Sequence, residues 1–312
     1  MSESTERHIA PHLADAARLP IDYPALYQAA SQSSRRGQKL FKLLTWIELG
    51  LVVLGAGAAA VASLSIMSER LVALLAGTAF LLAIVTRLSA RARQDDSAWF
   101  DGRAVAETVK SQTWRFVMRA TPFDQDSTAD RAFAEHLHRT LHARSGLRII
   151  ADVVPERGQI TEQMRSIRDL PVFERRDLYV AGRIQDQVDW YCRSARRHRR
   201  MSTRWSMLAI TSEGVAILTA AVAVANESLA LLDLFGVFGA LAAALTALNQ
   251  LGRHEESARA YSLACQELLT IASLADSVAT EEDLAVLVQD AEGAISREHT
   301  MWMAKRAEPL AG

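Results

Sequence analysis

Two acidic residues, Glu48 and Glu213, lie inside long apolar stretches of the chain. Residues 43–61 read LLTWIELGLVVLGAGAAAV, in which Glu48 is the one charged side chain. A charged group near the centre of a bilayer costs about 2.5 to 3.5 kcal/mol on insertion scales, so an acid there needs water, a proton or a partner. Glu48 and Glu213 are therefore candidates either for a polar intramembrane path that attracts cations or holds protons, or for interfacial acids that are neutral or paired with a Lys or Arg.

Three histidines, His136, His138 and His142, are the nearest approach to a metal site in the sequence. His138 and His142 would lie one helical turn apart, but no acid or further ligand stands at a fitting spacing, so a solvated helix is the preferred interpretation. The patterns GxGxxG, GxxxxGKS, GxxxxGKT, HExxH and GxSxG do not occur, which leaves phosphate loops, zinc proteases and nucleophile elbows without support. We expect no enzymatic activity, no catalytic residue, no cofactor and no metal.

The two cysteines, Cys192 and Cys265, do not belong to a CxxC or Cys/His ligand spacing. A disulfide framework and a structural zinc site are therefore not expected. Both thiols fit a reducing, cytosolic environment.

Four apolar stretches in two pairs determine the expected fold class. The first pair covers residues 43–67 and 70–88, and the second covers residues 205–225 and 229–251. A helix that crosses a bilayer needs roughly 20 apolar residues. A soluble bundle is the alternative, but water-soluble helices keep a polar face, and GLVVLGAGAAAV has none. We predict an all-α integral membrane protein with four transmembrane helices, arranged as two hairpins, plus cytoplasmic helices.

Basic residues precede the first stretch of each pair and follow the second, whereas the short loops within the pairs have few. By the positive-inside rule, both termini and the central connector should be cytoplasmic. Topology explains these Arg clusters, and the net charge of -1 argues against nucleic acid as a partner. The flanking basic residues are Arg35, Arg36, Lys39, Lys42, Arg87, Arg91, Arg93, Arg193, Arg196, Arg197, Arg199, Arg200, Arg204, Arg253 and Arg259.

The two pairs resemble each other at a nearly constant offset, which indicates an internal repeat. The matching positions are Tyr27 and Tyr191, Arg35-Arg36 and Arg199-Arg200, Glu48 and Glu213, Gly50 and Gly214, and Leu88 and Leu251. The predicted organisation is a polar tail (1–22), a first two-span unit (23–145), a connector (146–172), a second two-span unit (173–295) and a C-terminal tail (296–312).

Small residues at four-residue intervals, such as Gly239, Ala243 and Ala247, allow helices to approach closely in lipid. Packing within one chain and packing between copies both use such a face. The sequence does not separate the two.

Two stripes of aromatic and polar residues are predicted on helices outside the membrane. Each stripe repeats every three or four residues, so its members share one helical face. The first helix is expected to end at Pro122. The candidate interface residues are Trp99, Arg103, Glu107, Lys110 and Trp114 in the first stripe, and Tyr179, Arg183, Gln187, Trp190 and Tyr191 in the second.

The W-x3-R-x3-E-x2-K-x3-W-R run that leads to Pro122-Phe123, and the Y-x3-R-x3-Q-x2-W-Y run before a basic two-span hairpin, resemble the SLATT superfamily of SMODS- and SLOG-associating two-transmembrane effector domains. The resemblance covers roughly residues 23–295 as two tandem units. It implies a bacterial inner-membrane protein that forms pores as the effector of nucleotide-signalled antiviral or conflict systems. The second unit departs from the pattern, because Tyr261 and Glu267 follow its hairpin without the full run.

We therefore expect an oligomeric effector that permeabilises the bacterial inner membrane. Its expected partners are the lipid bilayer, further copies of the chain, and a separate cytosolic sensor or nucleotide-generating protein that triggers it. In this interpretation Glu48 and Glu213 bias the polarity of the lesion, and the two stripes relay the trigger. The alternatives are a membrane-anchored scaffold that recruits a soluble partner, and a channel or transporter subunit.

Overall fold

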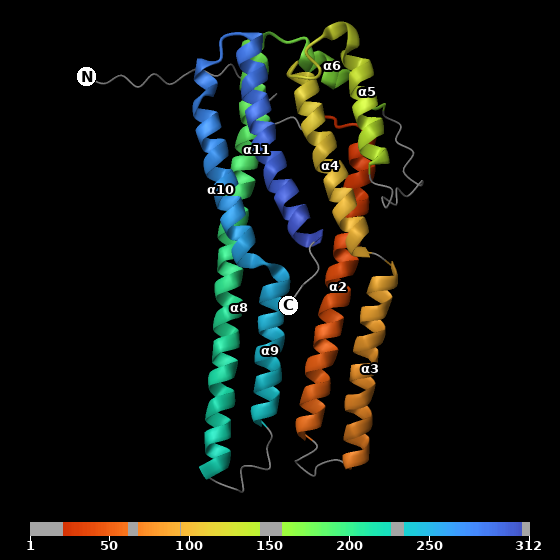
Figure 1. The fold of residues 1–312 in the computed structure, drawn as a ribbon, viewed down its shortest axis with the longest axis vertical. Helices are drawn as coiled ribbons and strands as arrows, with labels where there is room; N and C mark the ends of the chain where they lie inside the picture. Colours follow the sequence, from red (N-terminus) through yellow and green to blue (C-terminus); the bar gives the residue numbers. More distant parts are fainter. Residues whose placement is uncertain (1–20, 62–67, 94, 144–157, 226–233, 308–312) are drawn as a thin grey trace, which may run out of the picture. The chain divides into compact units, whose positions relative to one another are not determined.

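The computed structural model describes residues 21–61, 68–93, 95–143, 158–225 and 234–307, and every regular element within these ranges is helical (Figure 1). The helices of the first half are α2 (Ala25–Val61), α3 (Glu69–Arg93), α4 (Asp95–Val117) and α5 (Asp126–His142). Those of the second half are α6 (Glu162–Arg168), α7 (Val172–Tyr179), the π-helical turn η2 (Val180–Ile184), α8 (Gln185–Ala225), α9 (Leu234–Gly252), α10 (His254–Ser273), the 3-10 turn η3 (Ala275–Ser277) and α11 (Glu281–Ala307).

Three described helical segments are long and apolar enough to cross a membrane, namely Arg70–Ala90, Val172–Ala225 and Phe235–Ser277. They overlap the second, third and fourth predicted spans. The first predicted span, residues 43–67, begins within α2 and is not among the three, and its residues 62–67 lie outside the described part of the chain. The described part of the chain is thus all-helical with three candidate spans, while the fourth span and the duplicated hairpins stay predictions. The predicted connector sequence GLRIIADVV, with its hint of a short strand, also lies outside the described residues.

Internal contacts divide the chain into two compact units, and each unit combines segments from both predicted repeats. Unit 1 consists of Met1–Arg35, Ala98–Arg193 and Ala260–Gly312, and unit 2 consists of Arg36–Ser97 and Ser194–Arg259. Unit 1 contains most of α4, the helices α5 to α7, and α11. Unit 2 contains α3, α9 and the apolar halves of α2 and α8.

Three fully buried phenylalanines form a core in unit 1 where the chain turns from α4 into α5. The rings of Phe116, Phe123 and Phe133 lie 4.9 to 6.0 Å apart between centroids. Beside them the buried Arg168 of α6 donates hydrogen bonds to the carbonyl oxygen of Phe123 at 2.7 Å and to the carboxylate of Asp126. That hydrogen bond lowers the pKa of Asp126. Arg168 thus satisfies backbone and side-chain acceptors near the ends of two helices.

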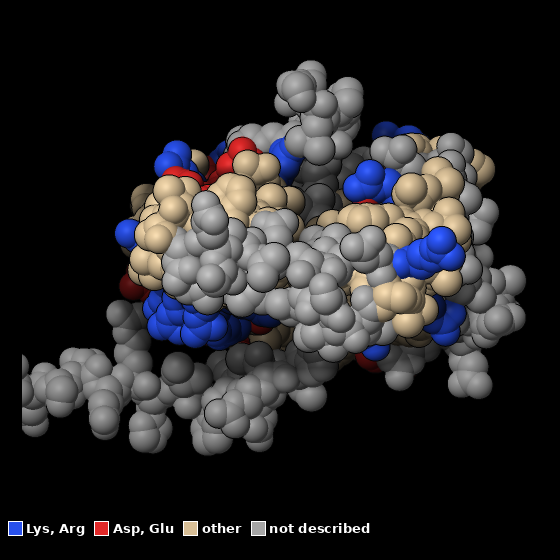
Figure 2. Space-filling model, turned by 90° about the horizontal axis from the view of Figure 1, so that it is seen from below, with Lys and Arg blue, Asp and Glu red and all other residues tan. Residues whose placement is uncertain are grey.

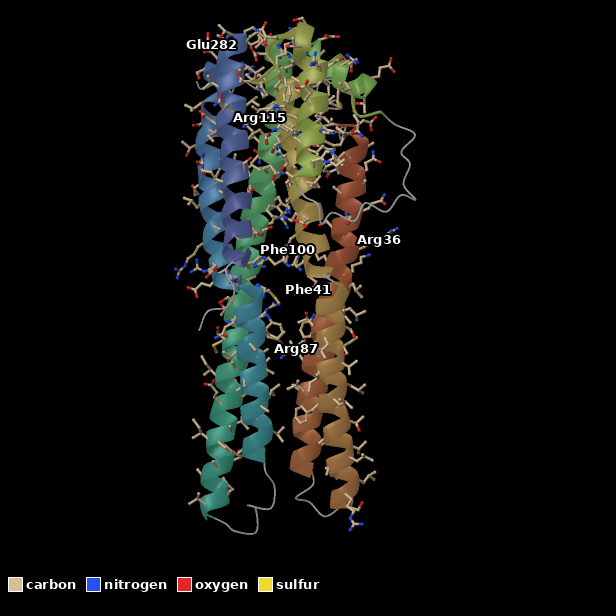
Figure 3. The ribbon with its side chains drawn as sticks, turned by 45° about the vertical axis from the view of Figure 1, so that its right-hand side comes forward. Arg36, Phe41, Arg87, Phe100, Arg115 and Glu282 are labelled. Carbon is tan, nitrogen blue, oxygen red and sulfur yellow. A yellow bond between two sulfur atoms is a disulfide. The ribbon has the colours of Figure 1, made fainter. Side chains whose placement is uncertain are left out.

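Many large apolar side chains of unit 2 are exposed, whereas long helices of water-soluble proteins keep a polar face toward the solvent. Leu74 and Leu81 of α3, and Ile210 and Ile217 of α8, are each at least 60% exposed. In the side chain view the sticks along the middle of α3 are mostly carbon (Figure 3). The described helix ends seen from below likewise show mainly uncharged residues, with Lys and Arg in separate patches (Figure 2). Hydrocarbon is the solvent that suits these surfaces.

Hydroxyl groups on the apolar helices are satisfied internally. Thr78 and Thr86 of α3 and Thr211 of α8 each donate to the carbonyl oxygen four residues earlier, at 2.7 to 2.8 Å. Such bonds remove the cost of placing a hydroxyl in lipid.

An aromatic contact joins α2 and α8 within unit 2. The rings of Trp46 on α2 and Trp205 on α8 lie 6.1 Å apart between centroids.

Gly102 marks the closest approach of α4 to α2 in unit 1. A Cβ atom at this position would lie 2.8 Å from the backbone nitrogen of Ser34 and 2.9 Å from the carbonyl oxygen of Ala30. The hydroxyl of Ser34 donates to the carbonyl oxygen of Trp99 at 3.1 Å across the same contact. Any side chain here would force the two helix backbones apart.

We expect Gly102→Ala to destabilise the protein by about 1 to 3 kcal/mol, because the new methyl group meets backbone atoms that cannot rotate away. The thermal unfolding midpoint of the detergent-solubilised protein measures this effect. Gly77→Ala on α3 is the matched control, since its Cβ would meet nothing within 4 Å and alanine favours helix. A midpoint for Gly102→Ala equal to that of the control would contradict the close approach.

Candidate functional site

The first of the two predicted intramembrane acids, Glu48, forms an ion pair within its own hairpin. Arg87 of α3 places its Nε and Nη2 atoms 2.7 Å from Oε1 of Glu48 on α2. The Glu48 side chain is 21% exposed, while that of Arg87, labelled in Figure 3, is 65% exposed. Glu48 therefore has the cationic partner that makes a carboxylate tolerable near lipid. The sequence suggested such pairing with a Lys or Arg but did not identify Arg87.

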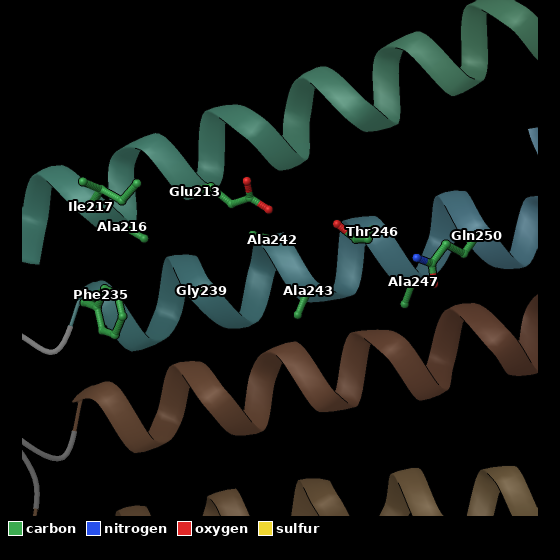
Figure 4. Close-up of a pocket in the computed structure, with 10 residues that line it drawn as sticks. All are labelled: Glu213, Ala216, Ile217, Phe235, Gly239, Ala242, Ala243, Thr246, Ala247 and Gln250. Carbon is green, nitrogen blue, oxygen red and sulfur yellow. The ribbon is translucent and has the colours of Figure 1, made fainter. Parts of the chain in front are cut away.

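The second acid, Glu213, faces a hollow of about 660 Å³ between α8 and α9. Figure 4 shows its carboxylate directed toward α9, across from Thr246. Small residues make the hollow by leaving space where larger side chains would fill it. They are Ala216 on α8 and Gly239, Ala242, Ala243 and Ala247 on α9.

Glu213 differs from Glu48 in having no cation beside it. The described residues show no ion pair or hydrogen bond to its side chain, and the residue is exposed. The offset that aligns Leu88 with Leu251 also aligns Arg87 with Gln250, which lines the hollow. The predicted repeat thus places the amide of Gln250 at the position that corresponds to the Arg87 guanidinium. The structure records no contact between the two acids among the residues it describes, so they belong to two separate polar sites.

The two predicted stripes pack against each other inside unit 1. The rings of Trp114 on α4 and Tyr179 on α7 meet edge to face at 5.5 Å. Farther along, the guanidinium of Arg103 lies 5.7 Å from the centre of the Trp190 ring. Lys110 is 4.0 Å from Asp186 between these two contacts. The order of the contacts shows that α4 runs antiparallel to the α7–α8 segment.

Burial follows from this arrangement. Six stripe residues are buried, namely Trp99, Trp114, Tyr179, Arg183, Gln187 and Tyr191. The other four, Arg103, Glu107, Lys110 and Trp190, are half-buried. Burial, aided by the charge of Arg183, lowers the pKa of the Lys110 ammonium.

The centre of unit 1 is a fully buried ion pair between Arg183 of η2 and Glu292 of α11. Arg183 donates through Nε at 2.8 Å and Nη2 at 2.7 Å to the two carboxylate oxygens. The Tyr179 hydroxyl donates to the same carboxylate at 3.1 Å, and Arg183 also donates to Ser111 of α4 at 3.3 Å. The network therefore joins α4, α7, η2 and α11.

The carboxyl group of Glu292 keeps its charge despite its burial. Burial alone would raise its pKa, but the charge and hydrogen bonds of Arg183 and the hydrogen bond from Tyr179 outweigh that effect, and the pKa is lowered below 4.5. Nearby, burial raises the pKa of Tyr23, whose hydroxyl accepts a hydrogen bond from Trp114 at 3.1 Å. A network of this kind is stable only when every partner is present.

Sequence reasoning did not single out Glu292, although a signal existed. Leu284, Leu287, Val288, Ala291 and Ile295 define the buried face of α11, and Glu292 falls on that face. An acid at an apolar-face position requires a buried cation.

The expectation that the two cysteines are not bonded is wrong. Cys192 of α8 and Cys265 of α10 form a disulfide, with their Cα atoms 5.7 Å apart. That distance suits a disulfide, and it arises because α8 and α10 pack side by side in unit 1. No local spacing in the sequence reports such a contact, since the two residues are separated by 73 positions.

The three histidines of α5 do not assemble a ligand set. The rings of His138 and His142 lie 4.2 Å apart, whereas His136 packs on Phe123 at 5.3 Å. Across the described helices, no group of three or more His, Cys, Asp or Glu side chains has the geometry to hold a metal ion.

Two family models match the chain in tandem. The model described as SMODS and SLOG-associating 2TM effector domain 3 (SLATT_3) matches residues 24–176, and that described as SMODS and SLOG-associating 2TM effector domain 1 (SLATT_1) matches residues 179–302. The first match contains the stripe on α4, and the second contains the stripe that begins at Tyr179. Comparison with curated proteins and with solved structures finds no match.

We expect Glu292→Ala to destabilise the protein by about 3 to 5 kcal/mol, because it leaves the Arg183 guanidinium buried without a counter-charge. The thermal midpoint in detergent reports the loss. The double variant Arg183→Met/Glu292→Leu removes both charges and should recover most of the lost stability. The control Glu135→Gln removes a carboxylate from an exposed ion pair with Arg131 and should leave the midpoint unchanged. A double variant as unstable as Glu292→Ala would contradict a pairwise electrostatic role.

Acid should weaken the same ion pair. The pKa of Glu292 is lower in the folded protein than its ordinary value of 4.5, so the stabilisation is complete above that pH and is lost as the pH falls through the folded value. The midpoint of the parent protein should therefore decrease more between pH 5 and pH 3 than that of Arg183→Met/Glu292→Leu. Parallel pH curves for the two proteins would show that Glu292 is not charged in the folded state.

Proposed function

Because the chain belongs to the SLATT superfamily of SMODS- and SLOG-associating two-transmembrane effector domains, we propose that it oligomerises in the bacterial inner membrane and permeabilises it when a cytosolic signal arrives. SLATT domains are membrane effectors associated with conflict and defence systems. The chain is accordingly a membrane protein of the effector type, and the proposal adds the lesion and its trigger.

The observation that best supports a lesion is the position of Glu213. It is an exposed carboxylate in a candidate span, it has no cation beside it among the described residues, and it faces a hollow lined with small side chains. Facing lipid, this charge would cost a few kcal/mol. Water in a lesion, or a polar surface of another copy packed into the hollow, removes that cost.

The first hairpin completes the proposed four-span arrangement. The apolar part of α2 carries the exposed side chains Leu43, Ile47 and Leu54, and its one acid is paired to Arg87 across the hairpin. A paired acid needs no water, so we assign Glu48 a structural role at the interface. This assignment leaves Glu213 as the acid that biases the lesion toward cations.

Unit 1 is the proposed receiver of the signal. Its two stripes meet on α4 and on the α7–α8 segment, and α8 continues as one helix into a candidate span. The trigger is proposed to be a separate cytosolic sensor or a nucleotide-generating partner. Any ligand that shifts the packing of α4 on α8 changes the helix that enters the membrane.

Two other functions remain as alternatives. A scaffold would use the spans as an anchor while unit 1 recruits a soluble enzyme, and the buried state of both stripes supports a rigid platform of that kind. A channel or transporter subunit would conduct a particular solute. The exposed acid, unpaired among the described residues, favours a water-filled path over a scaffold, since neither anchoring nor packing requires it.

Purified oligomers in liposomes loaded with a small cation test the proposal. We expect the parent protein, once activated, to release the cation, and Glu213→Gln to reduce cation over anion release several-fold. Arg87→Gln should instead lower the yield of folded protein, because it leaves the Glu48 carboxylate without its ion-pair partner. Glu255→Gln is the control, since it removes an exposed carboxylate paired with Arg259 outside the apolar stretches.

An absence of release from activated parent oligomers would favour the scaffold. Release with unchanged ion preference in Glu213→Gln would remove the acid from the proposal while keeping the lesion.

A further inference from the structure

The disulfide between Cys192 and Cys265 closes a covalent loop that contains the whole second predicted hairpin. Cys192 lies on α8 before the third predicted span, and Cys265 lies on α10 after the fourth. The helix that leads into the hairpin and the helix that leads out of it are therefore bonded together. While the bond exists, these two helices cannot separate at this level.

Aromatic rings beside the disulfide also join α8 and α10. The ring of Tyr261 on α10 lies 5.2 Å from that of Trp190 and 5.8 Å from that of Tyr191, both on the α8 side. Tyr191 and Tyr261 are buried. This aromatic contact lies beside the disulfide, so it brings the two thiols of a reduced pair back within reach whenever α8 and α10 pack together.

The two bonded cysteines differ in exposure. Cys265 is 1% exposed, whereas Cys192 is half-buried and is followed by the exposed Arg193. Exchange with a small thiol requires access to the sulfur that is attacked. The geometry therefore favours attack at Cys192 with Cys265 as the leaving group.

We propose that Cys192 and Cys265 form a redox-modification site for low-molecular-weight thiols and disulfides of the glutathione class, and that its oxidised form restrains the second hairpin. Disulfides are rare in the cytosol, and those that occur there are usually catalytic or redox-sensing. A bonded pair on helices predicted to be cytoplasmic fits the second of these roles. The regulatory half of the proposal rests on the membrane-permeabilising function proposed above.

The exchange is balanced in atoms and electrons. A small thiolate attacks Sγ of Cys192, a mixed disulfide forms, and the bond to Cys265 breaks to release its thiolate, which takes up a proton. A second small thiolate then attacks the sulfur that the first one contributed to the mixed disulfide. This step releases the Cys192 thiolate, which takes up a proton, and the disulfide of the two small thiols. The protein gains two electrons and the two small thiols lose them. Oxidised small disulfide reverses the sequence.

Labelling of the full-length protein with a polymer-linked maleimide tests the site, because the chain has no other cysteine. After incubation with oxidised glutathione, denaturation should expose no reactive thiol, and after reduced glutathione it should expose two. In the folded protein, Cys265→Ser should leave a thiol that reacts, and Cys192→Ser one that reacts only on denaturation. Two free thiols after oxidised glutathione, or a Cys265 that reacts as fast as Cys192, would overturn the site.

Liposome release tests the regulation separately. Reduced parent protein should release cation several-fold faster than oxidised protein, and the variant Cys192→Ala/Cys265→Ala should release at the reduced rate under both conditions. Equal rates for oxidised and reduced parent would overturn the restraint. If neither form releases cation, the proposed function fails, while the labelling result still decides whether the redox site exists.

Discussion

The solvent that surrounds unit 2 is the constraint on which the rest of the structure depends. Side chains such as Leu74, Leu81 and Ile217 are exposed on helices that contain long apolar windows. In water they would drive aggregation, whereas at the centre of a bilayer each contributes about 0.3 to 0.6 kcal/mol toward insertion. A hydrocarbon environment stabilises the exposed apolar side chains of these helices. In the same environment the charged groups of Glu48, Arg87 and Glu213 need an ion-pair partner or water.

That constraint separates two acids that sequence repetition makes look equivalent. Glu48 is matched by Arg87 on the adjacent helix, at 2.7 Å. Glu213 faces Thr246 and Gln250 across a hollow, and neither side chain carries a charge. The predicted repeat aligns Arg87 with Gln250, so the pairing available to Glu48 has no counterpart at Glu213 among the described residues.

The features that depend on local composition could be predicted from the sequence. Those that depend on how distant helices align and pack could not. Uninterrupted apolar runs predicted the helices that contain three candidate spans, and three- and four-residue spacing placed each stripe on one helical face. The partner of Glu48 depends on how α2 and α3 align, so Arg87 could not be chosen from several flanking basic residues. The bond between Cys192 and Cys265 depends on the packing of α8 on α10, and no spacing rule reports it. Glu292 was detectable as an acid on an apolar face, but only its partners Arg183 and Tyr179 lay within a recognised stripe.

The central claim is that the apolar helices are integral to a bilayer. Alkaline carbonate extraction of membranes from cells that express the full-length chain tests it most directly, because this treatment strips peripheral proteins and leaves membrane-spanning ones. The account predicts that the chain stays in the membrane pellet and leaves it only with detergent. Recovery of the chain in the carbonate supernatant, as a monodisperse soluble protein, would contradict the account.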